Sequence, residues 1–258
     1  MLLAIDTGNT NTVFAVFDDA GNIRGEWRAS SDVNRTADET GIWLLQLLGL
    51  AGLDRSSISA AIIASVVPAT VFSSRELCRR YFNCQPLIVG SPDVNIGIRI
   101  LIERPEEVGA DRLVNAVGTF HEYGGPKIVV DFGTATTFDV IDAEGNYLGG
   151  TIAPGINLSL AALHQAAAQL PRVAVGRPER VIGKTTVQAM RSGIFWGYVG
   201  LIEGMVERIR GELGFQAEVI ATGGLAPLFT ECCAALDRAD PHLTLKGLLE
   251  VYRRNARR

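Results

Sequence analysis

The stretch LLAIDTGNTNTVFAVFDDAGN, residues 2–22, decides the fold, because a second copy occurs later as IVVDFGTATTFDVIDAEGN, residues 128–146. In each copy a short apolar run ends at an aspartate, followed by one residue, a glycine, and small hydroxyl or amide residues. A strand containing phenylalanine comes next, and a second aspartate precedes a Gly-Asn turn. Two copies of one hairpin predict a chain made of two related halves.

The two copies align through pairs of like residues in the same order. A single hairpin with an aspartate cap is ordinary in β-structure, whereas two copies favour a duplicated nucleotide-binding fold. The pairs are Asp6 and Asp131, Gly8 and Gly133, Thr12 and Thr137, and then, after a gap of one residue, Phe14 and Phe138, Val16 and Val140, Asp18 and Asp142, and Gly21-Asn22 and Gly145-Asn146.

Each copy has the residues of a phosphate site. The glycine lets the backbone approach a phosphate without a Cβ in the way. Free backbone N–H groups and threonine or asparagine side chains then donate to phosphate oxygens. Asp6 and Asp131 cannot bind phosphate directly, but each can hold Mg²⁺ or another cation that bridges to it. Two such hairpins predict a nucleotide between two halves.

Composition is that of a soluble globular chain. Of 258 residues, 47% are hydrophobic and 20% are charged, and the net charge of −4 gives no sign of nucleic-acid or acidic-membrane binding. No run reaches the ~20 apolar residues of a membrane span, and LLAI is too short for a signal peptide. We therefore expect a cytoplasmic protein. Its cysteines have no zinc spacing and are expected to be buried thiols: Cys78, Cys84, Cys232 and Cys233.

Apolar periodicity predicts alternating strands and helices on both sides of the EYGGP breaker at 122–126. We expect a phosphate-binding half at 1–122 and a phosphate-, cation- and adenosine-binding half at 123–258. The expected strands are 2–6, 13–18, 22–28, 60–67, 86–89, the hairpin 128–146, 146–153 and the start of 217–226; the expected helices are 37–50, 68–81, 105–124, 153–170 and 185–213, with a loop at 91–105.

The segment EEVGADR, residues 106–112, carries a second kind of chemistry. At a helix start, Asp111 can act as a general base and Arg112 can clamp an anion. The alternative is a helix N-terminus whose acids only complement the helix dipole, a role that suits Glu106 and Glu107.

Together these motifs resemble those of the type III pantothenate kinases, a family of the actin, sugar-kinase and chaperone-ATPase superfamily. DTGNT, GADR and DFGTATT in that order are specific, whereas each alone is not. The resemblance implies an α/β fold of two ribonuclease-H-like halves, the duplicated actin-like ATPase fold, with a cleft between them. The matching segments are DTGNTNT at 6–12, SVVP at 65–68, PEEVGADRLVNA at 105–116, DFGTATTFDV at 131–140, GGTIAPG at 149–155, GKTTVQAMRSGIFWGYVGLIEG at 183–204 and ATGG at 221–224.

The resemblance also implies an activity, the ATP-dependent phosphorylation of pantothenate to 4'-phosphopantothenate, the first step toward coenzyme A. Asp6 would hold Mg²⁺, and Asp131 would hold K⁺ or ammonium. Thr134 would contact an ATP phosphate. Gly223 and Gly224 would lie against adenosine; the alternative is that these two glycines only form a strand-to-helix turn. The other residues implied at ATP are those of the first loop: Asp6, Thr7, Gly8, Asn9, Thr10, Asn11, Thr12 and Val13.

The pantothenate pocket follows from the same resemblance. The family commonly has an aromatic residue seven positions before the GADR glycine, and here that place holds Ile102, so one wall of the pocket differs. Its other implied residues are Gly109, Ala110, Asp111 as proton acceptor, Arg112, and Thr186 or its neighbour Thr185.

The segment 185–204 predicts a homodimer. Its glycines recur every three or four residues, which permits close helix approach, and Phe195, Trp196 and Tyr198 offer apolar area; packing in the core of one chain is the alternative. Two other functions stay open: a kinase for a different small molecule on the same fold, and a non-catalytic transcription accessory factor.

Overall fold

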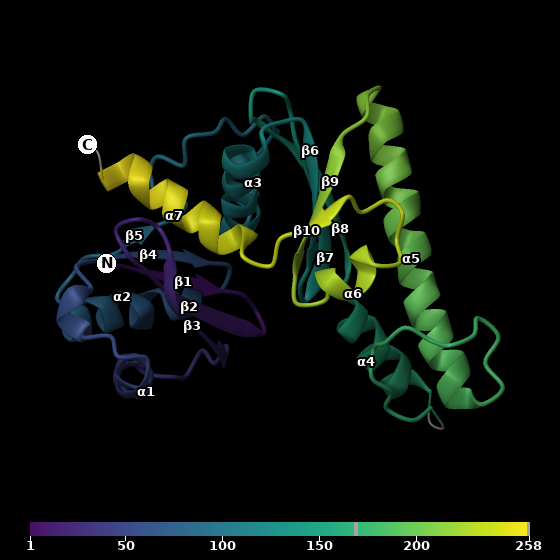
Figure 1. Cartoon of the computed structure of the whole chain (residues 1–258), viewed down its shortest axis with the longest axis horizontal. Helices are drawn as coiled ribbons and strands as arrows, with labels where there is room; N and C mark the ends of the chain where they lie inside the picture. Colours follow the sequence, from purple (N-terminus) through teal and green to yellow (C-terminus); the bar gives the residue numbers. More distant parts are fainter. Residues whose placement is uncertain (168–169, 257–258) are drawn as a thin grey trace. The chain divides into compact units, whose positions relative to one another are not determined.

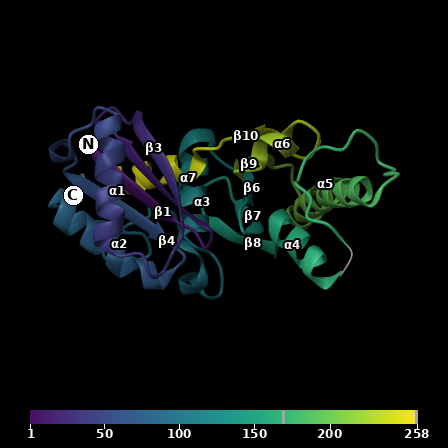
Figure 2. The ribbon, with the colours of Figure 1, turned by 90° about the horizontal axis from the view of Figure 1, so that it is seen from below.

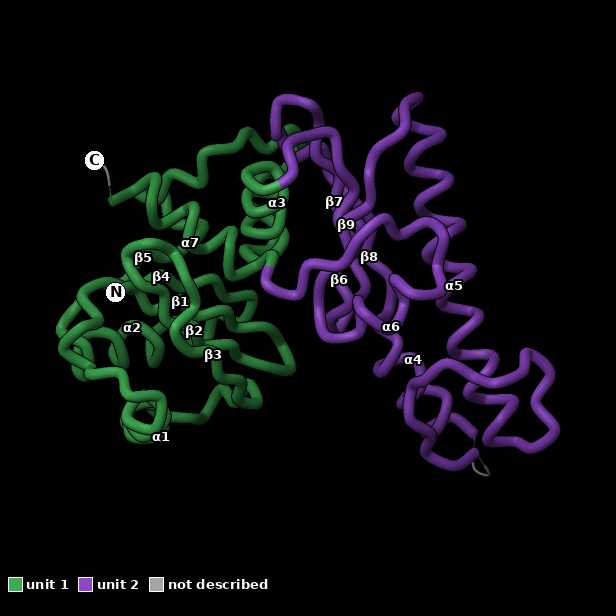
Figure 3. Tube along the Cα trace, viewed as in Figure 1, with its two compact units in different colours: residues 1–122, 243–258 green, residues 123–242 purple. Residues whose placement is uncertain are grey.

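The computed structural model describes residues 1–167 and 170–256 and divides into two compact units. Unit 1 is Met1–Glu122 with Leu243–Arg258, and unit 2 is Tyr123–His242 (Figure 3). The expectation that residues 243–258 belong to the second half is therefore wrong. The helix α7 (Leu243–Ala256) buries its apolar face, including Leu248, in a core that it shares with the first sheet.

Unit 1 is built on one mixed sheet. Its strands are β1 Leu2–Thr7, β2 Asn11–Phe17, β3 Ile23–Ser30, β4 Ala60–Ser65 and β5 Leu87–Ile88, and its other helices are α1 Ala37–Leu50, α2 Pro68–Phe82 and α3 Ala110–Tyr123, with short 3-10 turns at Arg55–Ser57 and Pro105–Glu107. The strand order is β3-β2-β1-β4-β5, with β4 and β5 parallel to β1. Helices α1 and α2 pack on the face that carries Leu3 and Ile5, and α3 and α7 on the opposite face (Figures 1 and 2).

Unit 2 repeats this architecture. Its strands are β6 Lys127–Phe132, β7 Ala135–Ile141, β8 Tyr147–Pro154, β9 Glu218–Gly223 and β10 Arg238–Ala239, and its helices are α4 Ile156–Ala166, α5 Thr186–Leu213 and α6 Ala226–Thr230. The order β10-β9-β6-β7-β8 is that of the first sheet, which confirms the duplicated α/β fold. Phe229 of α6 stacks between Phe132 and Phe195 at centroid distances of 5.1 and 5.3 Å, so α5 and α6 cover one face of the sheet. The helix expected over 153–170 ends at Ala166, and residues 168–169 lie outside the described part of the chain.

The duplication extends to the irregular positions. The pairing of the second and third strands of each unit shifts register at one equivalent place, after Val16 in unit 1 and after Val140 in unit 2. In each following turn an aspartate carboxylate accepts the backbone N–H of the asparagine, at 2.8 Å for Asn22 and 2.7 Å for Asn146. The two hairpins therefore share their backbone path as well as their sequence.

One pair in the expected alignment is wrong. Thr12 corresponds to Thr136 rather than to Thr137, because the residue opposite the strand-end aspartate is Val13 in the first hairpin and Thr137 in the second. The difference of one residue therefore lies in the turn itself, which is shorter in the second copy.

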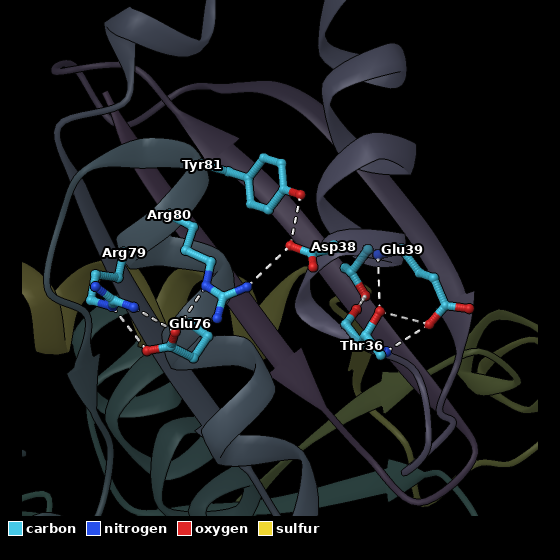
Figure 4. Close-up of polar contacts among 8 residues, drawn as sticks. Thr36, Asp38, Glu39, Glu76, Arg79, Arg80 and Tyr81 are labelled. Atoms are coloured by element: carbon cyan, nitrogen blue, oxygen red, sulfur yellow. Dashed lines mark hydrogen bonds and ion pairs between the residues drawn. The ribbon is translucent and has the colours of Figure 1, made fainter.

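Polar contacts fix the start of α1 and its packing against α2 (Figure 4). Thr36 and Glu39 form a capping box, in which the Thr36 N–H donates to the Glu39 carboxylate at 2.8 Å and the Glu39 N–H donates to the Thr36 hydroxyl at 3.2 Å. Asp38 accepts the Tyr81 hydroxyl at 2.9 Å and pairs with Arg80 at 3.4 Å.

The helix α5 is continuous over 28 residues in spite of its glycines. Phe195 and Tyr198 are buried in the core of unit 2, which was the alternative to an interface role for these aromatic residues. Gly193, Gly197 and Gly200 are exposed, and among the described residues nothing apart from the adjoining backbone of α5 lies within 4 Å of the place where a Cβ would stand on them. The glycine face of α5 is therefore open.

Two further expectations concern the whole chain. Within residues 1–167 and 170–256, no helix combines the length and apolar character needed to cross a membrane. All four cysteines are free thiols; Cys78, Cys84 and Cys233 are buried, as expected, whereas Cys232 is only partly buried and departs from the expectation.

Candidate functional site

The first hairpin presents Asp6 near the carboxyl end of β1. Because side chains alternate along a strand, Asp6 lies on the face of the sheet that α3 covers. The turn after it is tight: the Gly8 N–H donates to the Asn11 carbonyl at 3.0 Å, and a Cβ on Gly8 would lie 3.3 Å from that oxygen. Residues 9–11 are exposed, so their polar groups are accessible to an anion.

Thr7 and Thr12 point to the other face of the sheet. The Thr12 hydroxyl is 3.0 Å from the Ser31 hydroxyl. Thr7, which is 2% exposed, lines with Thr12 a cavity of about 40 Å³ that is also bordered by residues of α1 and α2. Neither side chain lies beside Asp6, so the expected nucleotide contacts of this hairpin fall to its backbone and to residues 9–11.

The GADR segment joins the first hairpin through Val66, the residue that follows β4. The Val66 N–H donates to the Thr7 carbonyl at 3.0 Å, and its Cγ1 lies 3.3 Å from the place of a Cβ on Gly109. A Cβ on Gly109 would also come within 2.6 Å of the Asp111 carboxylate. Asp111 and Asp6 therefore lie at one end and on one face of the first sheet. Val66 lies in SVVP, but the sequence contains no signal for its role, because its contacts are with distant segments.

Burial raises the pKa of the Asp111 carboxyl above its usual value. The backbone N–H of Arg112 donates to Asp111 Oδ1 at 2.7 Å and, with the Arg112 charge, lowers this pKa, but by less than burial raises it. A buried carboxylate is a stronger base than a solvated one, which suits the removal of a proton from an alcohol. Glu106 and Glu107, by contrast, are exposed.

In unit 2, Asp131 has the position in β6 that Asp6 has in β1. A Cβ on Gly223 would lie 2.7 Å from Asp131 Oδ1, and Gly223 has a φ of +89°, so glycine is needed there for two reasons. A Cβ on Gly133 would lie 4.0 Å from the same oxygen. A carboxylate oxygen between two glycines leaves room for a hard cation shared with phosphate oxygens, the usual arrangement in kinase sites. The residues at Asp131 therefore fit a bound cation.

Gly155 packs closely against the turn between β6 and β7 of the second hairpin. Its N–H donates to the Thr134 carbonyl at 3.0 Å, and a Cβ on Gly155 would collide with the carbonyls of Gly133 and Thr134. Thr134 itself is exposed, as is Gly224 after β9. The segment GGTIAPG contains no signal that singles out Gly155, because its contact is with the backbone of the turn at 133–134.

At the start of α5, Thr185 and Thr186, between which the sequence does not decide, have different surroundings. The Thr185 hydroxyl accepts the Gln188 N–H at 3.2 Å and so caps the helix, whereas Thr186 is exposed at the first helical position. Ile102, in unit 1, is partly buried in the segment before GADR.

Solved structures share this fold at low identity. A Campylobacter jejuni protein named as a conserved Baf family transcriptional activator has a TM-score of 0.62 at 18% identity, covering 99% of this chain and 100% of that one. A Sinorhizobium meliloti protein named as a 2-dehydro-3-deoxygalactonokinase has a TM-score of 0.60 at 14% identity, covering 98% and 96%. These likenesses show the fold alone.

Relatives found by sequence have a much higher identity to this chain than these solved structures have. The chain is 67% identical to the type III pantothenate kinase of Paramagnetospirillum magneticum, over 99% of this chain and 98% of the relative. Identity to that of Rhodospirillum rubrum is also 67%, over 99% of both chains. The sequence profile of type III pantothenate kinase matches residues 2–208. The chain belongs to the type III pantothenate kinase family.

Proposed function

We propose that this chain transfers the γ-phosphoryl group of ATP to the primary hydroxyl of pantothenate, giving 4'-phosphopantothenate in coenzyme A biosynthesis. One observation carries the proposal: in a chain of this family, the partly buried carboxylate of Asp111 lies at the same sheet end as Asp6. Phosphoryl transfer to an alcohol needs an acceptor for the hydroxyl proton, and otherwise mainly positioning and charge neutralisation.

Each site residue has a role in this proposal. Asp111 accepts the hydroxyl proton, and Arg112 with the backbone of residues 109–110 holds the carboxylate and amide of pantothenate. Ile102 is assigned to one wall of the pantothenate pocket, and Thr186 is assigned a contact with pantothenate. The exposed turn 9–11 and Thr134 donate to ATP phosphates, and Gly223 with Gly224 lies against adenosine.

The cations belong to the same proposal. An ATP-dependent kinase needs a divalent cation, and we assign Mg²⁺ to Asp6 and K⁺ or ammonium to Asp131. When bound, these cations neutralise the polyphosphate charge. The glycines that flank the Asp131 carboxylate support a cation there.

We also propose a cytoplasmic homodimer. The open glycine face of α5 supports the dimer, because a second helix can approach it closely. The segment just before α5 also carries two strongly exposed apolar residues of unit 2, Val181 at 66% and Ile182 at 82%. Four free thiols suit a reducing compartment.

The test of the activity is ATP consumption by the purified chain with and without pantothenate, with the product identified by its mass. We expect consumption that depends on pantothenate and a product heavier by one phosphate group. A panel of other small alcohols, including sugars, separates this function from another kinase on the same fold. Consumption that is indifferent to pantothenate but stimulated by a panel member would overturn the proposal.

A further inference from the structure

Residues 94–102, called the strap below, lead into the GADR segment of unit 1. Burial alternates along the strap: Ile96, Ile98, Ile100 and Ile102 are half-buried, and the residues between them are exposed. Ile96 and Ile98 pack against the core that contains residues of α3 and α7. The strap is therefore docked through Ile96 and Ile98 and continues to Ile102, which is also half-buried.

The last turn of α7 holds the strap by its backbone. The Asn255 side chain donates to the Asn95 carbonyl at 2.9 Å and accepts the Asn95 N–H at 3.0 Å, so one amide satisfies both backbone groups of one residue. Arg254 Nη1 donates to the Gly97 carbonyl at 2.8 Å, while its Nε is held by Glu250 at 2.7 Å. These contacts join segments about 160 residues apart in the chain.

The contact between Gly97 and Arg254 requires glycine at position 97. Its φ of +76° lies in the left-handed region, and a Cβ there would collide with the Arg254 side chain. Because burial alternates along the strap, a slip of one residue would turn its isoleucines outward and replace Ile102 by an exposed neighbour. The contacts at Asn95 and Gly97 oppose such a slip.

We propose that Arg254 and Asn255 are positioning residues for the pantothenate pocket: from the far end of the chain they hold the strap in register and so place Ile102. The inference rests on the proposed function, in which Ile102 forms a wall of that pocket. Neither residue touches substrate. Asn95 is exposed, so its backbone groups can bond to water when Asn255 is shortened, and the change costs little stability.

The same turn supplies a matched control. Arg253, one residue earlier, donates to the Ala20 carbonyl in the turn between β2 and β3 at 3.1 Å instead of to the strap. Arg253→Ala therefore removes a similar side chain from the same helix end while leaving the strap contacts in place.

The experiment measures steady-state kinetics of Asn255→Ala, Arg254→Ala and Arg253→Ala in the full chain. For the first two variants we expect the KM for pantothenate to rise about five- to tenfold, with kcat and the KM for ATP within about twofold of the parent. Arg253→Ala should match the parent. An unchanged KM for pantothenate, or an equal rise in the KM for ATP, would overturn the proposal.

Two further measurements separate positioning from a general loss of structure. Ile102→Ala combined with Asn255→Ala should raise the KM for pantothenate little more than the larger single change, since both act through Ile102; additive effects would count against the proposal. Hydrogen exchange should speed up at strap amides in Asn255→Ala and not in Arg253→Ala. If the parent shows no pantothenate-dependent ATP consumption, the proposed function is wrong, and so is the role of Arg254 and Asn255 in the pantothenate pocket. Hydrogen exchange at the strap amides would still show whether α7 holds the strap.

Discussion

Asp111 combines burial, a raised pKa and a backbone donor, and its amide analogue keeps the shape without the ability to take a proton. We predict that Asp111→Asn lowers turnover with pantothenate by about 10²–10⁴-fold, while the affinity for ATP changes by less than about twofold. Turnover and ATP affinity are compared in variant and parent. Retention of more than about a tenth of parent turnover would contradict the assignment of Asp111 as general base.

The same carboxyl links stability to pH. Its pKa is raised in the folded chain, so the folded state binds the proton more tightly than the unfolded state, and stability falls as pH rises from the usual value of 3.8 through the raised value. At pH 7 the partly desolvated charge therefore destabilises the fold. We predict that Asp111→Asn has a higher Tm than the parent at pH 7 and that the difference vanishes below about pH 3.5. A lower Tm at pH 7 would show that the carboxylate stabilises the fold.

At Asp131 the prediction concerns monovalent cations. A cation beside this carboxylate would offset phosphate charge, so activity should need K⁺ or ammonium in addition to Mg²⁺. The test is the rate in sodium-only buffer followed by a potassium titration. Gly223→Ala, which crowds Asp131 Oδ1 and strains a φ of +89°, should raise the half-activating potassium concentration. Equal rates in sodium and potassium would remove the role assigned to Asp131.

At the scale of elements, the capping box of α1 gives a prediction separate from the site. Thr36→Ala should lower the free energy of unfolding by about 1 kcal/mol, because the helix loses a side-chain acceptor for the Glu39 N–H. Thr36→Ser is the control, since it keeps the hydroxyl. Denaturant melts of both variants make the comparison. Equal stability of Thr36→Ala and parent would mean that water replaces the cap at no cost.

Local signals explain which elements the sequence predicts well. The helix at 37–50 is found at its expected bounds, where local signals such as the Thr36 cap act. The helix expected over 185–213 is found over Thr186–Leu213 in spite of its glycines, because the face opposite them is anchored in the core by Phe195 and Tyr198. Strand β10 has only two residues, too few for any periodicity, and gains its place by pairing with β9.

The same distinction holds for the candidate site. The duplicated hairpins mark Asp6 and Asp131 in the sequence because repetition is visible without a structure. Val66 and Gly155 are not marked, since each acts through a contact with a segment distant in the chain. The placement of α7 likewise depends on long-range packing, in which Gly247 lies against the backbone of α3, and sequence adjacency pointed to the wrong half.

At the scale of the whole molecule, the dimer proposal depends on the open glycine face of α5. Light scattering at micromolar concentration should give twice the chain mass of 27.7 kDa. Gly197→Glu should produce monomers, since a Cβ there meets nothing within 4 Å among the described residues apart from the adjoining backbone of α5, whereas the full side chain would obstruct a partner helix. Gly211→Glu, on the same helix, outside the glycine-rich segment and equally open, is the control and should stay dimeric. A fully active monomeric parent would end the proposal.

If the dimer forms through the start of α5, Thr186 can serve the pocket of the partner chain, and this sharing has a measurable consequence. Asp111→Asn and Thr186→Arg chains are each expected to be inactive alone. In a mixed dimer with shared pockets, one site combines the intact Asp111 of one chain with the intact Thr186 of the other. Random mixing should then restore about a quarter of parent activity, since half of the dimers are mixed and each has one complete site. Confirmed mixed dimers without activity would place every site within a single chain.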